Sequence, residues 1–124
     1  MKLEDYLQLL QTKIRTIFPN FTIYDINLPK KDNIYGEYEV LNVKSQNNWL
    51  EVNSGFRFYI KHKMSEKYLN LYKIAVKILK IITLTGGKDV SFEIHNLNEE
   101  IKNDYVIFFN FIILCNEDLN EIWE

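Results

Sequence analysis

The sequence predicts an α+β domain in which two helices pack against a mostly antiparallel sheet. Apolar residues recur at spacings of three and four in two segments, and segments rich in β-branched and aromatic residues lie between and after them. No internal repeat or linker divides the chain. The predicted order is α-β-β-β-β-α-β-β. Because 124 residues is the length of one domain, we expect a single α+β domain over residues 1–124.

Composition narrows the class of protein. The chain is 47% hydrophobic with a net charge of -2, which favours a folded core and disfavours general binding of polyanions. Cys115 is the only cysteine, which excludes an internal disulfide. No apolar run reaches the roughly 20 residues that span a bilayer. The acidic start at residues 1–5 lacks the apolar stretch of a signal peptide, so we expect the chain to fold in a cytoplasm.

The first predicted element is a helix over residues 2–18. Glu4 and Asp5 lie in its first turn, where acidic side chains favour the helix dipole, and Pro19 ends it. The hydrophobic period then changes. Residues 21–28 are rich in β-branched and aromatic side chains and predict the first strand.

The central part of the chain predicts three further strands. Residues 35–44 and 49–52 form two of them, separated by a polar turn at residues 45–48. A second turn at residues 53–55 precedes the strand 56–63, whose side chains alternate between an apolar and a basic face. The apolar face carries Phe56, Phe58 and Ile60, and the basic face carries Arg57, Lys61 and Lys63.

A second amphipathic helix is predicted over residues 66–82. Ser65 is a favourable N-cap, and Gly86 and Gly87 form the exit turn. The main apolar stripe of this helix consists of Tyr68, Leu71, Tyr72, Ala75, Leu79 and Ile82. Its opposite face is basic and carries Lys73, Lys77 and Lys80.

Two strands, at residues 90–97 and 105–115, complete the predicted fold. A charged loop over residues 98–104 joins them. The last strand is apolar on both faces apart from Asn110. An exposed strand of this kind would aggregate, so we expect it in the centre of the sheet or in a subunit interface.

The residues that most often perform chemistry have no supporting pattern. His62 and His95 lack the spacing of metal ligands and are interpreted as surface or sheet-face histidines. Cys115 ends an apolar strand, where a thiol acts as a small hydrophobic group. The sequence therefore predicts no enzyme, no metal site and no cofactor. The basic faces of the strand 56–63 and of the second helix are compatible with phosphate or an acidic partner, but a solvated face is the simpler interpretation.

The order of elements resembles the tail-terminator, or tail-completion, family of long-tailed phages and phage-like contractile particles. The resemblance lies in the pattern of elements and covers nearly the whole chain. The matching parts are the opening helix at residues 3–18, the strand 56–63, the helix 65–82, the strand 90–97, the charged loop 98–104 and the strand 105–115.

This resemblance implies a virion structural protein without catalytic activity. It would form a ring, usually of six copies, that caps the head-proximal end of the tail tube and stops its polymerisation. The ring would then join the neck, or form a collar that closes a headless contractile particle. Its partners would be further copies of itself, the tail tube protein and a sheath or neck protein. DNA would at most pass through the lumen, and the particle would be made in the bacterial cytoplasm, with no role for a membrane.

Exposed loops, basic positions and surplus apolar residues are the candidates for such an interface. Two alternatives remain open: a small cytoplasmic binding module or regulator, and a small enzyme with an aromatic-lined pocket. A deep pocket holding His62, His95 or carboxylates would favour the enzyme. The candidate subunit or tube contacts are Trp49, Arg57, Lys61, Lys63, Asn98, Glu99, Glu100, Phe109 and Phe111, and the candidate basic face is Lys73, Lys77 and Lys80.

Overall fold

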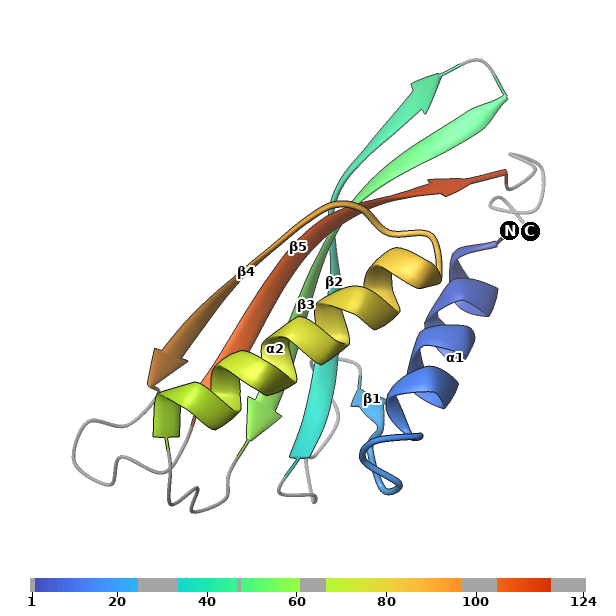
Figure 1. Ribbon diagram of the computed structural model, residues 1–124. Coiled ribbons are helices and arrows are strands. Elements are labelled where there is room, and N and C mark those ends of the chain that lie inside the picture. Colours follow the sequence, from blue (N-terminus) through green and yellow to red (C-terminus); the bar gives the residue numbers. More distant parts are fainter. Residues whose placement is uncertain (1, 25–33, 47, 61–66, 97–104, 117–124) are drawn as a thin grey trace.

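A computed structural model describes residues 2–24, 34–46, 48–60, 67–96 and 105–116 and confirms the α+β class. Its two helices lie on the same face of a five-stranded sheet (Figure 1). The other face carries no helix from the described residues. The elements in chain order are α1 (Leu3–Ile14), β1 (Ile23–Tyr24), β2 (Ile34–Gln46), β3 (Trp49–Ile60), α2 (Lys67–Leu84), β4 (Lys88–Asn96) and β5 (Tyr105–Cys115).

The strand order in the sheet is β1-β2-β3-β5-β4. All neighbouring strands are antiparallel except β1 and β2, which pair in parallel, so the prediction of a mostly antiparallel sheet is confirmed. The strongly apolar β5 lies inside the sheet between β3 and β4. An internal position satisfies the backbone of this strand on both sides, as its composition requires.

One predicted boundary in the middle of the chain is wrong. Residues 49–52 and 56–60, expected in two separate strands, belong to the single strand β3, and residues 53–55 form no turn. Residues 61–63 of the second predicted strand lie outside the described residues. Asn53 and Gly55 are residues typical of turns, but here each is paired with β2 on one side and with β5 on the other. Because two long ladders fix the backbone at these positions, tertiary pairing overrides the local preference.

The ends of other elements also differ from prediction. β1 spans only Ile23–Tyr24, while residues 25–28 of the predicted strand lie outside the described residues. The helix α1 ends at Ile14, and hydrogen-bonded turns follow it, with the Phe18 N–H donating to the Ile14 carbonyl at 3.0 Å. Gly86 has a φ of 117° at the exit of α2, as the predicted glycine turn requires.

The core lies between the helices and the sheet. Tyr6 of α1 is fully buried, and its hydroxyl donates to the Ile82 carbonyl at the end of α2 at a distance of 3.1 Å. Among the described side chains of the predicted apolar stripe, Tyr72 is misplaced, because it is 55% exposed; its ring centre lies 6.2 Å from that of Phe92. Among the described side chains of the two helices, the fully buried ones are Tyr6, Leu10, Ile14, Leu71, Ala75, Ile78 and Ile82.

Candidate interaction surface

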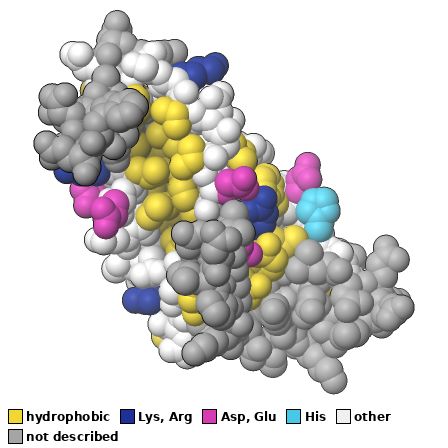
Figure 2. All heavy atoms as spheres, turned by 180° about the vertical axis from the view of Figure 1, so that it is seen from behind, with side chains coloured by type: hydrophobic (Ala, Val, Ile, Leu, Met, Phe, Trp, Pro, Cys, Tyr) yellow, Lys and Arg dark blue, Asp and Glu magenta, His cyan; other side chains and the backbone are white. Residues whose placement is uncertain are grey.

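The face of the sheet opposite the helices is the main candidate site, and we call it the open face. Alternation along β3 places Phe56 and Phe58 against the helices and sends Arg57 and Tyr59 to the open face. Figure 2 shows that hydrophobic side chains gather over this face beside acidic, basic and histidine side chains. The partly buried apolar side chains that β5 sends to this face are Phe108, Ile112 and Leu114.

A bulge in β2 adds an exposed apolar residue to the open face. The register with β3 shifts between Val40 and Asn42, which makes Leu41 the extra residue. Leu41 is 42% exposed and lies over Gly55. A Cβ added at Gly55 would lie 3.5 Å from the Leu41 side chain and 3.4 Å from the ring of Phe108. The missing side chain of Gly55 thus brings Leu41 and Phe108 into one apolar area.

Arg57 lies at the centre of the open face. Its Nη2 donates to the Oε2 of Glu39 at 3.0 Å, and its guanidinium lies 5.4 Å from the centre of the Phe108 ring. The side chains of this ion pair are 30% and 38% exposed, so the pair is partly solvated and contributes little to stability. The guanidinium is flat and lies over an aromatic ring. Its other N–H groups can donate hydrogen bonds to a protein that docks on the open face.

Tyr59 forms the second polar contact of the open face. Its hydroxyl is hydrogen-bonded to the Glu37 carboxylate, and its ring stacks on that of Tyr35 with the ring centres 4.7 Å apart. Burial, together with the hydrogen bond to Glu37, raises the pKa of Tyr59 to about 12. Because Tyr59 stays protonated at neutral pH, it acts as a hydrogen-bond donor that orients Glu37.

We expect the free energy of unfolding to fall above about pH 10. Burial raises the pKa of Tyr38 to about 12 as well, against the lowering effect of its hydrogen bond with Ser54. Tyrosines in the unfolded chain ionise near pH 10, so between about pH 10 and 12 the unfolded state loses these protons first. The stabilisation is therefore complete below about pH 10 and is lost as the pH rises through the pKa of the folded chain. Urea unfolding at successive pH values measures the loss, and a midpoint that stays constant to about pH 12 would contradict this expectation.

The hairpin of β2 and β3 is the most projecting part of the described chain. Figure 1 shows it extending past the helices. Its side chains lose the cover of the core there: Val43 and Trp49 are each 50% exposed. Trp49 was predicted as an interface residue, and the structure places it near the tip of this hairpin, accessible to a partner.

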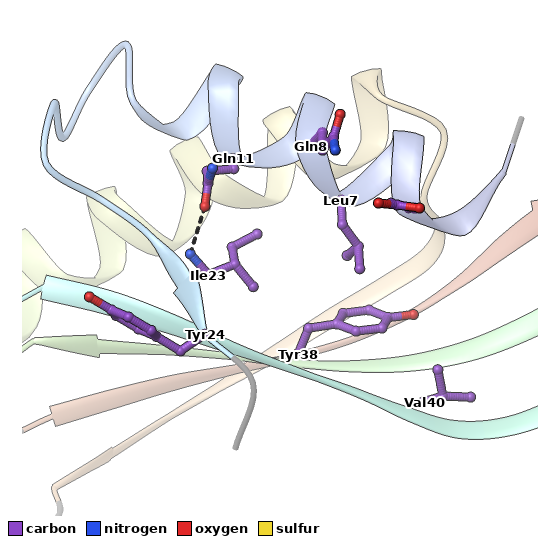
Figure 3. A pocket seen from close by; sticks show the side chains of 8 residues that line it. Leu7, Gln8, Gln11, Ile23, Tyr24, Tyr38 and Val40 are labelled. Carbon is purple, nitrogen blue, oxygen red and sulfur yellow. Dashed lines mark hydrogen bonds between the residues drawn. The ribbon is translucent and has the colours of Figure 1, made fainter. Parts of the chain in front are cut away.

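A groove of about 420 Å³ lies between α1 and the strands β1 and β2 (Figure 3). Leu7 points into it from α1, and Tyr38 and Val40 line it from β2. The Tyr38 hydroxyl is 2.7 Å from the Ser54 hydroxyl, and the Oε1 of Gln11 accepts the N–H of Ile23 at 2.9 Å. The groove thus combines apolar and polar side chains: Gln11 and Tyr38 hold β1 and β3 through these contacts, and Glu4 and Gln8 of α1 also line it.

The histidine expected to mark an enzyme pocket is elsewhere. His95 projects from β4, where its Nε2 lies 2.9 Å from the Oε2 of Glu93, and it does not line the groove. His62 lies outside the described residues. Cys115 is buried at the end of β5. Within residues 2–24, 34–46, 48–60, 67–96 and 105–116, no group of three or more His, Cys, Asp or Glu side chains could hold a metal ion.

Two of the predicted interface residues require correction. Phe109 and Phe111 are fully buried beneath the helices, so neither can reach a partner. The physical reason is the alternation of β5: its odd-numbered residues face the helices and its even-numbered residues face outward. Phe108 is the neighbouring aromatic residue that faces outward.

The other predicted positions are distributed over different surfaces. Lys73, Lys77 and Lys80 are all exposed on α2, on the helix side of the molecule. They therefore do not combine with Arg57 into one basic surface. The residues that lie outside the described part of the chain are Lys61, Lys63, Asn98, Glu99 and Glu100.

Sequence reasoning missed several residues of these surfaces. Tyr38, Val40, Leu41 and Val43 were part of a predicted strand, but nothing indicated that they remain accessible. The bulge contributes to their accessibility, and it has no clear signal in the sequence. Neither described helix is both long and apolar enough to span a bilayer.

Compared with known proteins, the chain matches no protein family, and no curated protein matches it.

Proposed function

We propose that this chain is a structural protein that assembles with further copies of itself into a ring on the end of a tail tube. In this role it would end tube polymerisation and either join the neck or close a headless particle, as a tail terminator or collar does. Two supports of different kinds underlie the proposal: the resemblance in the order of elements, and the apolar area on the open face. The role involves no catalytic step.

The observation that carries the proposal is the apolar area around Phe108, Ile112 and Leu114 on the open face. Covering apolar surface contributes about 25 cal/mol for each Å² removed from water. Continuous apolar areas on a small domain typically mark contacts with other proteins. The position of Arg57 and its carboxylate partner beside this area suits an interface with an apolar centre and a polar rim.

A ring requires a head-to-tail contact in which one surface of a subunit meets a different surface of the next. The two layers of this domain differ in charge in a way that suits such a contact. The open face carries the carboxylates Glu37, Glu39, Glu51 and Glu93 together with the cations Arg57 and Lys44, whereas the described side chains of α2 include no carboxylate and present Lys73, Lys77 and Lys80 on the other side. The lysine face of one subunit would thus meet the acidic surroundings of the apolar area on the next.

The decisive measurement is the mass of the protein in solution, by light scattering, alone and with tail tube protein from the same source. We expect a ring-sized species, or rings seen by electron microscopy at the tube ends. Ile112→Glu adds a charge to the open face and should abolish the ring while leaving the fold intact. Thr12→Glu adds the same charge to the exposed surface of α1 and serves as the control. A protein that stays unassembled and ignores the tube would overturn the proposal.

A further inference from the structure

The edge of β2 beyond β1 is a free strand edge in the described part of the chain. β1 pairs only with Gly36 and Glu37, and no described strand lies beside β2 from Tyr38 to Gln46 on that side. Three of four consecutive residues of this edge are large, apolar and accessible: Val40 and Leu41 are 42% exposed and Val43 is 50% exposed, and Asn42 is the fourth. Accessible apolar edges promote pairing with another strand, and natural proteins usually cover them.

The direction of the backbone groups along this edge follows from one hydrogen bond. The Gly36 N–H donates to Thr22 on the β1 side at 2.9 Å, so the pair of Gly36 with Phe58 is not hydrogen-bonded across β2 and β3. Pairs of this kind recur at every second residue of β3. The β2 partners of Phe56, Ser54, Val52 and Leu50 therefore direct their backbone groups to the free edge, and these partners are Tyr38, Val40, Val43 and Ser45.

We propose that β2 pairs with β2 of a second copy of this chain, antiparallel and about a two-fold axis between Leu41 and Asn42. In this register, Val40 lies opposite Val43 of the second copy, and Tyr38 lies opposite its Ser45. All four residues direct N–H and C=O groups to the edge, so both pairs are of the hydrogen-bonded type. The bulge is the reason that Val40 and Val43 direct their backbone groups to the same edge. In a regular strand, residues three apart direct these groups to opposite sides.

The side chains match in the same register. Val40 and Val43 face the helix side, because their β3 partners Ser54 and Val52 are two residues apart and buried. Each valine therefore meets a valine of the other copy on one face of the joined sheet.

The charges are complementary on the other face. Glu39 and Lys44 pair with Gly55 and Glu51 of β3, which have the same parity as Arg57, so both side chains belong to the open face. The register places Glu39 opposite Lys44 of the second copy. The two-fold axis produces this ion pair twice, and oppositely charged residues directly across two strands stabilise the pairing.

The groove beside α1 also gains an occupant. It lies on the helix side of β2 and is lined by Leu7, Tyr38 and Val40 (Figure 3). In the paired arrangement, Val43 of the second copy lies next to Val40 and enters this space. One contact thus covers both the free edge and the groove.

This dimer goes beyond the ring proposed above and does not depend on it. A two-fold contact uses the same surface on both copies, whereas a ring needs two different surfaces. The dimer is therefore a form of the free protein that covers its apolar edge, and the ring uses the open face and α2.

Reversal of the two charges tests the register. Light scattering over a concentration series of the full chain, without tube protein, should show a dimer. Glu39→Lys places two lysines opposite each other at both sites, and Lys44→Glu places two glutamates there. We expect each single variant to weaken the dimer at least about tenfold, because attraction is replaced by repulsion twice. The double variant Glu39→Lys with Lys44→Glu should restore the dimer, although it lacks the native pairing of Arg57 with Glu39.

The controls separate loss of the dimer from loss of the fold. Lys13→Glu makes an equal charge change on the exposed surface of α1, outside the groove, and should dimerise like the unaltered chain. Circular dichroism melts establish that every variant is folded, and Val43→Lys provides a second disruption at a side chain that the single subunit leaves half exposed. An unaltered chain that is monomeric up to its solubility limit overturns the proposal. A dimer that persists in both single variants, Glu39→Lys and Lys44→Glu, would also overturn the proposal. The ring is tested by assembly on the tube ends and by Ile112→Glu, which leaves the β2 edge unchanged, so the two proposals can fail independently.

Discussion

Replacing Phe109 with alanine is expected to lower the free energy of unfolding by about 3–5 kcal/mol. Its ring is fully buried, and the ring centres of Phe56 and Phe92 lie 6.1 Å and 5.9 Å from its own. The helices α1 and α2 pack against this layer of sheet side chains, so a cavity left by the missing ring cannot collapse completely. A domain of this size is typically stable by about 5–15 kcal/mol, so the variant should lose a large part of its stability. Urea unfolding followed by circular dichroism measures the difference.

The adjacent residue supplies the matched control. Phe108 carries the same side chain on the same strand but faces the open side, where it is only partly buried. Phe108→Ala should cost about 1 kcal/mol, because solvent or a neighbour can replace the lost contacts. If Phe109→Ala were as stable as the unaltered chain but failed to assemble, Phe109 would belong to an interface rather than to the core.

Phe108 and Phe109 show that the sequence predicts the position of β5 in the sheet better than it predicts which face of β5 meets the helices. The composition of β5 correctly predicts an internal strand, because both of its faces are apolar. The same property makes it hard to predict which face meets the helices, since Asn110 is the only polar residue of the apolar run and a single residue indicates the alternation weakly. The register with β3 establishes the alternation: Phe109 lies opposite Phe56 and Phe108 lies opposite Arg57.

The break predicted within β3 is wrong for a related reason. Asn53 and Gly55 carry a strong local preference for turns, and that preference predicted a break in β3. Two ladders outweigh it, because pairing with β2 on one side and β5 on the other holds the strand extended at both residues. A pairing of this kind joins residues far apart in sequence, so a pass along the chain cannot detect it. The helices depend on local periodicity and were predicted within a few residues, with the largest difference at the C-terminal end of α1.

The candidate surfaces were predicted only in part. Arg57 was identified because a basic residue alternates with aromatic ones, and the structure places it at the centre of the open face. The matching of Glu39 with Lys44 could not be found in the same way. These residues are five apart, an odd spacing that puts them on opposite faces of a regular strand. Only the bulge between them returns both to one face, and a bulge depends on the partner strand.

Replacing Gly36 with alanine is expected to destabilise the fold by about 1–3 kcal/mol, although the change adds a single methyl group. A Cβ at this position would lie 2.7 Å from the Cζ of Phe21 and 2.9 Å from the Cζ of Phe56. Both rings are fully or almost fully buried, and their centres lie 6.1 Å apart in a stacked pair, so neither ring can move without disturbing the core. The shift would also act on β1, because the Gly36 N–H donates to Thr22 beside it.

Gly55→Ala is the control that separates this steric effect from the general cost of changing a strand glycine. Both glycines lie inside the ladder of β2 and β3, yet a Cβ at Gly55 would meet its nearest atom at 3.4 Å, an ordinary contact distance. Alanine restricts the unfolded chain more than glycine does, so Gly55→Ala should be neutral or slightly stabilising. Thermal melts of the two variants should therefore shift in different directions or by clearly different amounts. Equal shifts would mean that Phe21 and Phe56 do not press on Gly36, and the packing of β1 against the core would then need a different explanation.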